Sequence, residues 1–321
     1  MTLSIVAALL LFSQSVFASS FSIEMADSHK IYLSGQDCES VKKEVELIQQ
    51  WTIGRHEIAT DLQIHCEDNP SLNSIDITSI LPKIVREQYG VYPSCDGPNC
   101  WNWSLVESKL ESTLRYVDNE EWKFYLEKYC RLRQVKNNDP VQAGDVAAIR
   151  HRNKTGQISE VHGFISVGEL ACTKNGYTNE NPYRIQPVEE VFDTYDVSPF
   201  SECRIGLENP PPYCKTYVNF FQCSKERGKS MEDLGDYQIL MTALADLNVI
   251  DEITSLMEAS NYSDLTSVKD KLITLGKISL NSPEIIQLRD VLIQSLNEQV
   301  SFFDDRNKIA EFDTESDWFS Y

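Results

Sequence analysis

The chain has 321 residues, 41% of them hydrophobic and 10% aromatic, a composition that excludes disorder throughout and allows one large or two modest domains. Its 29 Lys and Arg against 49 Asp and Glu give a formal net charge of −20. The negative electrostatic potential of such a protein opposes attraction to nucleic acids and anionic lipid surfaces. Beyond the N-terminus no run of about 18 apolar residues exists, so the sequence predicts no nucleic-acid partner and no membrane span.

The N-terminus has the pattern of an export signal. Residues 3–12 are apolar and uncharged, and Val16-Phe17-Ala18 places β-branched and small residues at the −3 and −1 positions of a signal-peptidase site. We expect a signal peptide over residues 1–18 and a secreted or periplasmic protein. A buried N-terminal strand is the alternative, because no Lys or Arg precedes the apolar stretch.

Export makes the cysteine count informative, because most cysteines of an exported protein form disulfides and nine cannot all pair. A free Cys100 would leave eight cysteines for four disulfides. No CxxC is present and the histidines show no ligand-like spacing, so neither a metal nor a cofactor is predicted. The nine are Cys38, Cys66, Cys95, Cys100, Cys130, Cys172, Cys203, Cys214 and Cys223.

The first segment after the signal, residues 19–71, predicts a small α+β subdomain. Apolar alternation indicates strands at 21–25, 30–33 and 61–66, and helical spacing indicates a helix at 36–51. Cys38 and Cys66 are candidates to tie this subdomain together.

Residues 72–225 alternate helix-like and strand-like pieces and form the predicted α+β centre of the molecule. From 226 to 321 cysteine is absent and acidic residues dominate, and Tyr237, Leu240, Leu244, Leu247 and Ile250 recur at helical spacing. Further helices are expected near 265–278 and from Ser282, an N-cap followed by Pro283. We expect an acidic helical region whose apolar stripes form a bundle core and whose outer face is available to a protein partner.

One stretch of the central segment carries the residues of a nucleophilic site. The turn Asp96-Gly97-Pro98-Asn99 leads into a helix-compatible run with Cys100 at the junction. A cysteine in the first helical turn meets free N–H groups and the positive end of the helix dipole, which favour the thiolate. A disulfide between Cys95 and Cys100 is the alternative.

A thiolate nucleophile needs a base and an orienting group. His162 opens the strand-like run 161–168, and Asn175 lies in a turn after the next strand. The order of helix cysteine, strand histidine and side-chain amide is the one that a papain-like site requires. A structural histidine and a simple turn asparagine are the alternatives.

These residues resemble the NlpC/P60 group of papain-fold cysteine peptidases, in which a cysteine opens a helix, a PGD turn precedes a strand, and a histidine opens the next strand. The matching positions are Cys100, the turn Ala143-Gly144-Asp145, and His162. The resemblance covers about residues 85–180 and implies a papain-like α+β domain with Asn175 as the third polar residue. It also implies an upstream tyrosine, Tyr89 or Tyr92, as the oxyanion donor. Asn99-Cys100-Trp101-Asn102 departs from the family's usual Asp-Cys-Ser-Gly.

The sequence therefore predicts a cysteine hydrolase that cleaves an amide bond through an acyl-enzyme, and the resemblance implies a peptidoglycan stem peptide as substrate. Two other functions stay open. One is a non-catalytic secreted binding or scaffold protein with a papain-like fold and an acidic helical docking region. The other is an enzyme whose helical region covers its own cleft.

Overall fold

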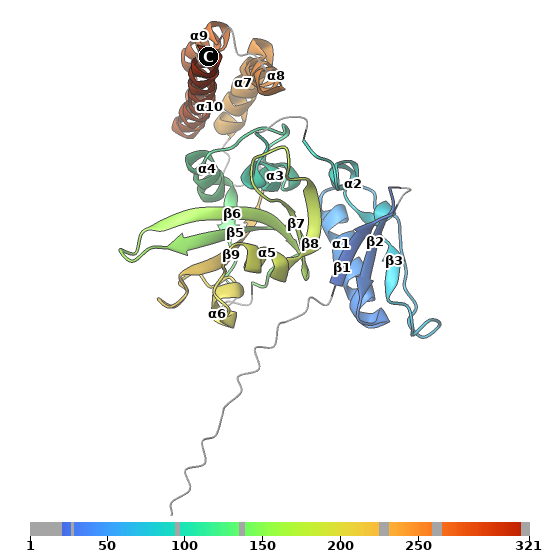
Figure 1. Cartoon of the computed structure of the whole chain (residues 1–321). Helices are drawn as coiled ribbons and strands as arrows, with labels where there is room; N and C mark the ends of the chain where they lie inside the picture. The colour runs from blue at the N-terminus through green and yellow to red at the C-terminus, as the bar shows by residue number, and fades with distance from the viewer. Residues whose placement is uncertain are drawn as a thin grey trace, which may run out of the picture.

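The structure is a computed structural model that describes residues 21–26, 29–93, 97–134, 139–224, 231–258 and 265–315. The predicted signal peptide and Cys95 lie outside the described residues. The predicted α+β class is confirmed: the chain contains two antiparallel sheets and a set of C-terminal helices (Figure 1).

A three-stranded sheet and one helix form the N-terminal unit. Helix α1 (Cys38–Gly54) begins with a capping box in which Asp37 Oδ1 accepts a hydrogen bond from Ser40 N at 2.8 Å, and a disulfide joins Cys38 to Cys66. The sheet has the order β1-β2-β3, and its strands are β1 (Phe21–Met25), β2 (Ile31–Gly35) and β3 (Ser74–Asp76).

The strand predicted at 61–66 is absent. Residues 61–65 have no regular secondary structure and the chain turns at Cys66, while the third strand is β3, which pairs with β2 through Leu33 and Ile75. The apolar alternation at 61–66 has another cause: Ile64 and Cys66 pack into the core and the disulfide holds this segment to α1.

A six-stranded antiparallel sheet forms the centre, in the order β4-β9-β5-β6-β7-β8. Helices α3 (Cys100–Glu107) and α4 (Asn119–Tyr129) cover one face, and α5 (Val188–Thr194) covers the other (Figure 1). The strands are β4 (Cys130–Leu132), β5 (Asp145–Arg152), β6 (Ile158–Val167), β7 (Leu170–Lys174), β8 (Tyr183–Pro187) and β9 (Thr216–Cys223). Among the short helical segments, η1 (Thr78–Ile80) and α2 (Lys83–Gln88) lie between β3 and α3, and α6 (Ser201–Arg204) lies between β8 and β9.

Alternate residues of the central strands belong to two separate cores. Val146 and Ile165 are partners in the β5–β6 ladder and pack in the core on the α3 side. Ala147 and Phe164, the next partners, pack in the core on the α5 side with Phe192. This period of two assigns each side chain of β5, β6 and β7 to one face.

The C-terminal region is helical, as predicted. The apolar stripe from Tyr237 to Ile250 is interrupted at Asn248, whose φ of 52° ends one helix and allows the next to start in a new direction. The Ser282 N-cap is confirmed, since its Oγ accepts from Ile285 N at 3.3 Å. The helices are α7 (Met231–Leu247), α8 (Val249–Glu258), α9 (Thr266–Gly276) and α10 (Pro283–Glu315).

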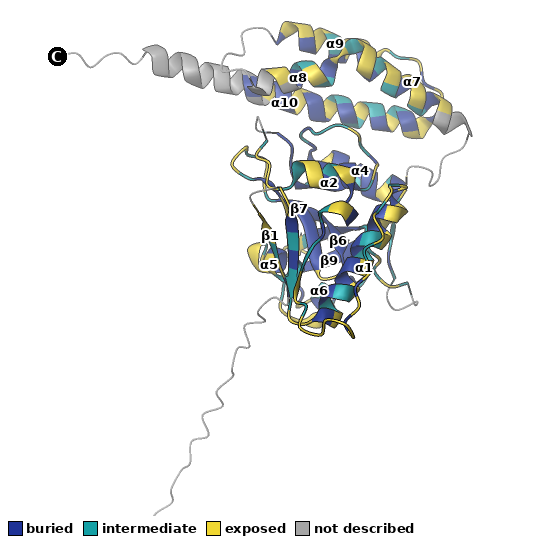
Figure 2. Cartoon of the chain, turned by 90° about the vertical axis from the view of Figure 1, so that its right-hand side faces the viewer, coloured by how far each residue is buried: buried dark blue, intermediate teal, exposed yellow. Residues whose placement is uncertain are grey.

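The C-terminal helices pack on each other and on the central unit. Leu272, Leu296 and Val300 belong to a core of their own, whereas Leu288 and Leu292 of α10 join the main core on the α3 side. Figure 2 shows the helices as a layer next to α4. Among the described residues, no helix combines the length and apolar character needed to cross a bilayer.

Among the described residues, three disulfides connect six cysteines: Cys38–Cys66, Cys130–Cys223 and Cys203–Cys214. Cys100 and Cys172 are both free and buried. No fourth disulfide is therefore formed within the described part of the chain, which does not include Cys95. The pairing pattern fits a secreted protein.

Candidate functional site

Cys100 is the first residue of α3, as the turn-to-helix transition predicts. Asn99 is the N-cap, and its side-chain oxygen accepts from Asn102 N at 3.0 Å. The Cys100 side chain is free of any disulfide, and the residue is only 7% exposed. The alternative disulfide with Cys95 is therefore not formed.

Two opposing influences act on the Cys100 thiol. Burial raises its pKa to about 11, while nearby backbone N–H groups, that of Gly163 foremost and then that of Trp101, lower the pKa. The thiol is therefore neutral in this state at neutral pH. Backbone donors that converge on one sulfur are nevertheless the arrangement that stabilises a thiolate or an oxyanion.

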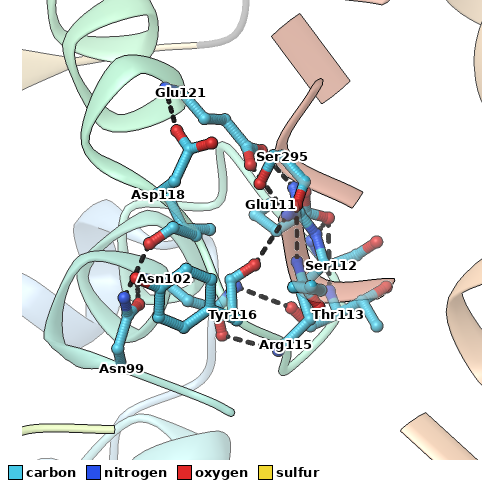
Figure 3. A network of polar contacts seen from close by, with 12 residues as sticks. Asn99, Asn102, Glu111, Ser112, Thr113, Arg115, Tyr116, Asp118, Glu121 and Ser295 are labelled. Carbon is cyan, nitrogen blue, oxygen red and sulfur yellow. Dashed lines mark hydrogen bonds and ion pairs between the residues drawn. The ribbon is translucent and has the colours of Figure 1, made fainter. Parts of the chain in front are cut away.

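The segment between α3 and α4 fixes the start of α3 through side-chain amides (Figure 3). Asn99 Nδ2 donates to Val117 O at 2.6 Å, and Asn102 Nδ2 donates to Thr113 O at 2.9 Å. Asn102 Oδ1 accepts from Arg115 N at 2.9 Å. The two asparagines that flank Cys100 thus anchor the helix start to this segment.

Buried charges hold the same segment in place. The Arg115 guanidinium is buried and forms ion pairs with Glu121 of α4 and, at 2.9 Å, with Glu111. Asp118 caps α4 by accepting from Glu121 N at 2.7 Å. Figure 3 shows this network beside Ser295 of α10, so the C-terminal helices lie against the segment that anchors Cys100.

His162 lies on β6 and is completely buried. Its Nε2 is 2.8 Å from Thr173 Oγ1, and its ring stacks on Tyr195 with a centroid distance of 3.9 Å. Burial lowers the pKa of His162 to about 3, so the imidazole is neutral. Nδ1 is buried and has no hydrogen-bond partner among the described residues.

Cys100 and His162 meet at the backbone of β6 but from opposite faces of the sheet. A Cβ on Gly163 would lie 3.0 Å from Trp122 and 3.2 Å from Ser104 Oγ, so this position faces α3 and α4. His162, the preceding residue, faces the α5 side, where its ring contacts Phe164 and Tyr195. The structure thus brings the sulfur to the residue after His162 and shows no hydrogen bond between thiol and imidazole.

The hydrogen-bonding role predicted for Asn175 belongs to Thr173 in this structure. Both residues are expected on the α5 side, two positions apart, but Thr173 is the one within β7. Asn175 precedes Gly176, whose φ of 81° turns the chain away. The Asn175 side-chain oxygen is buried and accepts no hydrogen bond in the described part of the chain.

Neither tyrosine predicted as an oxyanion donor has a hydrogen bond to Cys100 among the described residues. Tyr89 is half-buried and its hydroxyl donates to Ile23 O at 3.5 Å, toward the N-terminal sheet. Tyr92 is 60% exposed. Burial raises the pKa of Tyr195, and a thiolate at Cys100 raises it further. Burial also raises the pKa of Tyr116, and Asp118 and Glu298 raise it more than Cys100 does.

Sequence reasoning missed Thr173, Tyr195 and Lys174. Thr173 was detectable, because strand alternation places it on the same face as Asn175. Tyr195 directly follows α5 and had no local signal that joined it to His162. Asp145, the last residue of the matching turn, shapes that turn by accepting from Gln142 N at 2.7 Å.

Comparisons with known proteins give no match, whether with protein-family models, curated proteins or solved structures.

Proposed function

We propose that this chain is an exported cysteine hydrolase of amide bonds, with Cys100 as the nucleophile and His162 as the base in a papain-like domain. The observation that carries the proposal is the free Cys100 thiol in the first turn of α3, where nearby backbone N–H groups favour its thiolate. Six of the described cysteines are paired, while Cys100 and Cys172 are free; of these two, Cys100 is the one that opens a helix.

The proposed reaction transfers the Cys100 proton to His162 as the sulfur attacks the amide carbonyl. The backbone N–H groups stabilise the oxyanion, the C–N bond breaks, and imidazolium returns the proton to the leaving amine. Water then cleaves the thioester and regenerates the thiol. When Nε2–H donates to Thr173, Nδ1 carries the lone pair that a general base needs.

The described state is a resting form in this proposal. The thiol pKa of about 11 and the imidazole pKa of about 3 oppose proton transfer, and both values result from burial. Entry of a polar substrate and water reduces that desolvation, which moves the two pKa values toward each other. Substrate binding must also bring the imidazole and the sulfur, now on opposite faces of β6, within reach of each other.

A second function is a non-catalytic secreted binding or scaffold protein. The observation that favours it is the same pair of shifts: a buried neutral thiol and a buried neutral imidazole are what a core position requires. In that case the acidic helices α7–α10 are the docking region for a protein partner.

Incubation with peptidoglycan stem peptides, followed by mass spectrometry of the products, separates the two functions. Under the hydrolase proposal the wild-type protein and Cys172→Ala hydrolyse one amide bond, while Cys100→Ala does not. Cys172→Ala is the matched control because it removes the other buried free thiol. Equal activity in Cys100→Ala, or no hydrolysis of any stem peptide by the wild type, would favour the binding protein.

A further inference from the structure

Lys174 is a fully buried lysine on the Cys100 side of the central sheet. It ends β7 and pairs with Tyr183 of β8, whose ring lies 4.4 Å from the Trp103 ring of α3. Directly opposite residues of an antiparallel pair share a face. The Lys174 side chain therefore points to the side on which α3 and Cys100 pack.

The Lys174 ammonium organises the turn that follows β7. Its Nζ donates to Gly176 O at 3.1 Å and to Thr178 O at 3.0 Å. Between these two acceptors, Tyr177 O accepts from Gly97 N at 2.8 Å. The turn held by Lys174 thus binds the chain three residues before Cys100.

The Lys174 ammonium lies on the same face of the sheet as the thiol. Ile165 is opposite Cys172, and the same register, continued two residues beyond the paired segment, would place Gly163 opposite Lys174. Burial raises the pKa of the Cys100 thiol, and the backbone N–H of Gly163 and, as the smallest contribution, the positive charge of Lys174 lower it. Face and charge together place Lys174 on the side where negative charge would develop.

We propose that Lys174 is a positioning residue that stabilises the Cys100 thiolate during the reaction. Burying an ammonium costs several kcal/mol, and a thiolate that develops on the same face of the sheet offsets part of that cost. The role rests on the proposed function of Cys100. In this role the Lys174 ammonium supplements the backbone N–H groups and the N-terminus of α3, which also favour the thiolate.

Alkylation of Cys100 by iodoacetamide tests the proposal without a substrate. The full mature chain, with its disulfides intact, is labelled between pH 8 and 9.5, and peptide mass mapping separates Cys100 from Cys172. In this range the rate follows the minor thiolate fraction. Lys174→Gln keeps a donor for the Gly176 and Thr178 carbonyls but removes the charge. Lys174→Arg keeps the charge and is the matched control.

We expect Lys174→Gln to lower the Cys100 alkylation rate about tenfold at each pH, the change that one unit of thiol pKa produces. Lys174→Arg should react within about twofold of the wild type. Equal rates in Lys174→Gln and wild type would overturn the proposal. A Lys174→Gln chain that fails to fold, as measured by far-UV circular dichroism, would also contradict the proposal, because the ammonium would then be needed for folding and not for the thiolate. If only the stem-peptide hydrolysis fails, the hydrolase proposal is contradicted. The alkylation rates test the effect of Lys174 on the Cys100 thiolate separately.

Discussion

The α3-facing side of strands β6 and β7 meets the Cys100 thiol and carries the Lys174 ammonium, whereas the α5-facing side carries His162 and Thr173. On the first side, nearby backbone N–H groups and the charge of Lys174 favour an anion at the sulfur. On the second, aromatic rings and one hydroxyl surround an imidazole.

The two sides therefore favour different charges. The α3 side is prepared for an anion, while the α5 side disfavours a cation, because His162 has an aromatic stack and no acidic partner among the described residues. The Gly163 backbone separates the two groups. A reaction that needs thiolate and imidazolium together must therefore change the surroundings of His162 on the α5 side more than the surroundings of Cys100 on the α3 side.

The largest expected effect concerns the pH dependence of stability on the α5 side. Below pH 6.5 the unfolded chain takes up a proton on His162, while the folded chain does not until about pH 3. Stability from the neutral, buried imidazole is thus fully present above pH 6.5 and is lost as the pH falls toward 3, at on the order of 1.4 kcal/mol per pH unit. Urea unfolding from pH 7 to 4 should show this loss in wild type and not in His162→Phe.

The control for that measurement is His151→Phe, which replaces an exposed histidine of β5. It is expected to keep the wild-type pH dependence, and acidic residues common to all three proteins cancel when free energies of unfolding are compared. Equal slopes for wild type and His162→Phe would show that the imidazole is not buried as described.

An intermediate effect is expected at Gly163, where the two sides meet. In Gly163→Ala the added methyl group lies 3.0 Å from Trp122 and 3.2 Å from Ser104 Oγ, so α3 and α4 must shift away from β6. We expect a loss of about 1–3 kcal/mol in the free energy of unfolding at pH 7, typical of overpacking. Gly54→Ala is the control, because nothing lies within 4 Å of its added Cβ. A Gly163→Ala protein as stable as Gly54→Ala would contradict close packing at this position.

Local signals predicted most of the secondary structure near the site. The turn before Cys100, the strand that contains His162 and the Ser282-Pro283 helix start were visible, because caps, turns and apolar periods are encoded within a few residues, although that strand begins at Ile158 and His162 does not open it. The segment at 61–66 was misread because its apolar residues pack beside a disulfide rather than in a ladder.

The arrangement of the site required contacts between distant parts of the chain. The face to which His162 points depends on its register with β5, and the stack with Tyr195 joins residues 33 positions apart. The approach of Lys174 to Cys100 depends on the β6–β7 ladder. A single sequence contains no local pattern for such pairings, so it supplied the candidate residues without their mutual orientation.

The smallest expected effect comes from Thr173, the only hydroxyl bonded to His162 among the described residues. Thr173→Val keeps the shape of the side chain and removes that hydrogen bond, which should cost about 0.5–1.5 kcal/mol in the free energy of unfolding at pH 7. Thr173→Ser keeps the hydroxyl and serves as the control. Nitrogen chemical shifts of His162 should report Nε2–H in wild type and in Thr173→Ser. If Thr173→Val leaves both the shifts and the stability unchanged, then stacking alone orients the imidazole, and another group, Asn175 foremost, must fix its tautomer for catalysis.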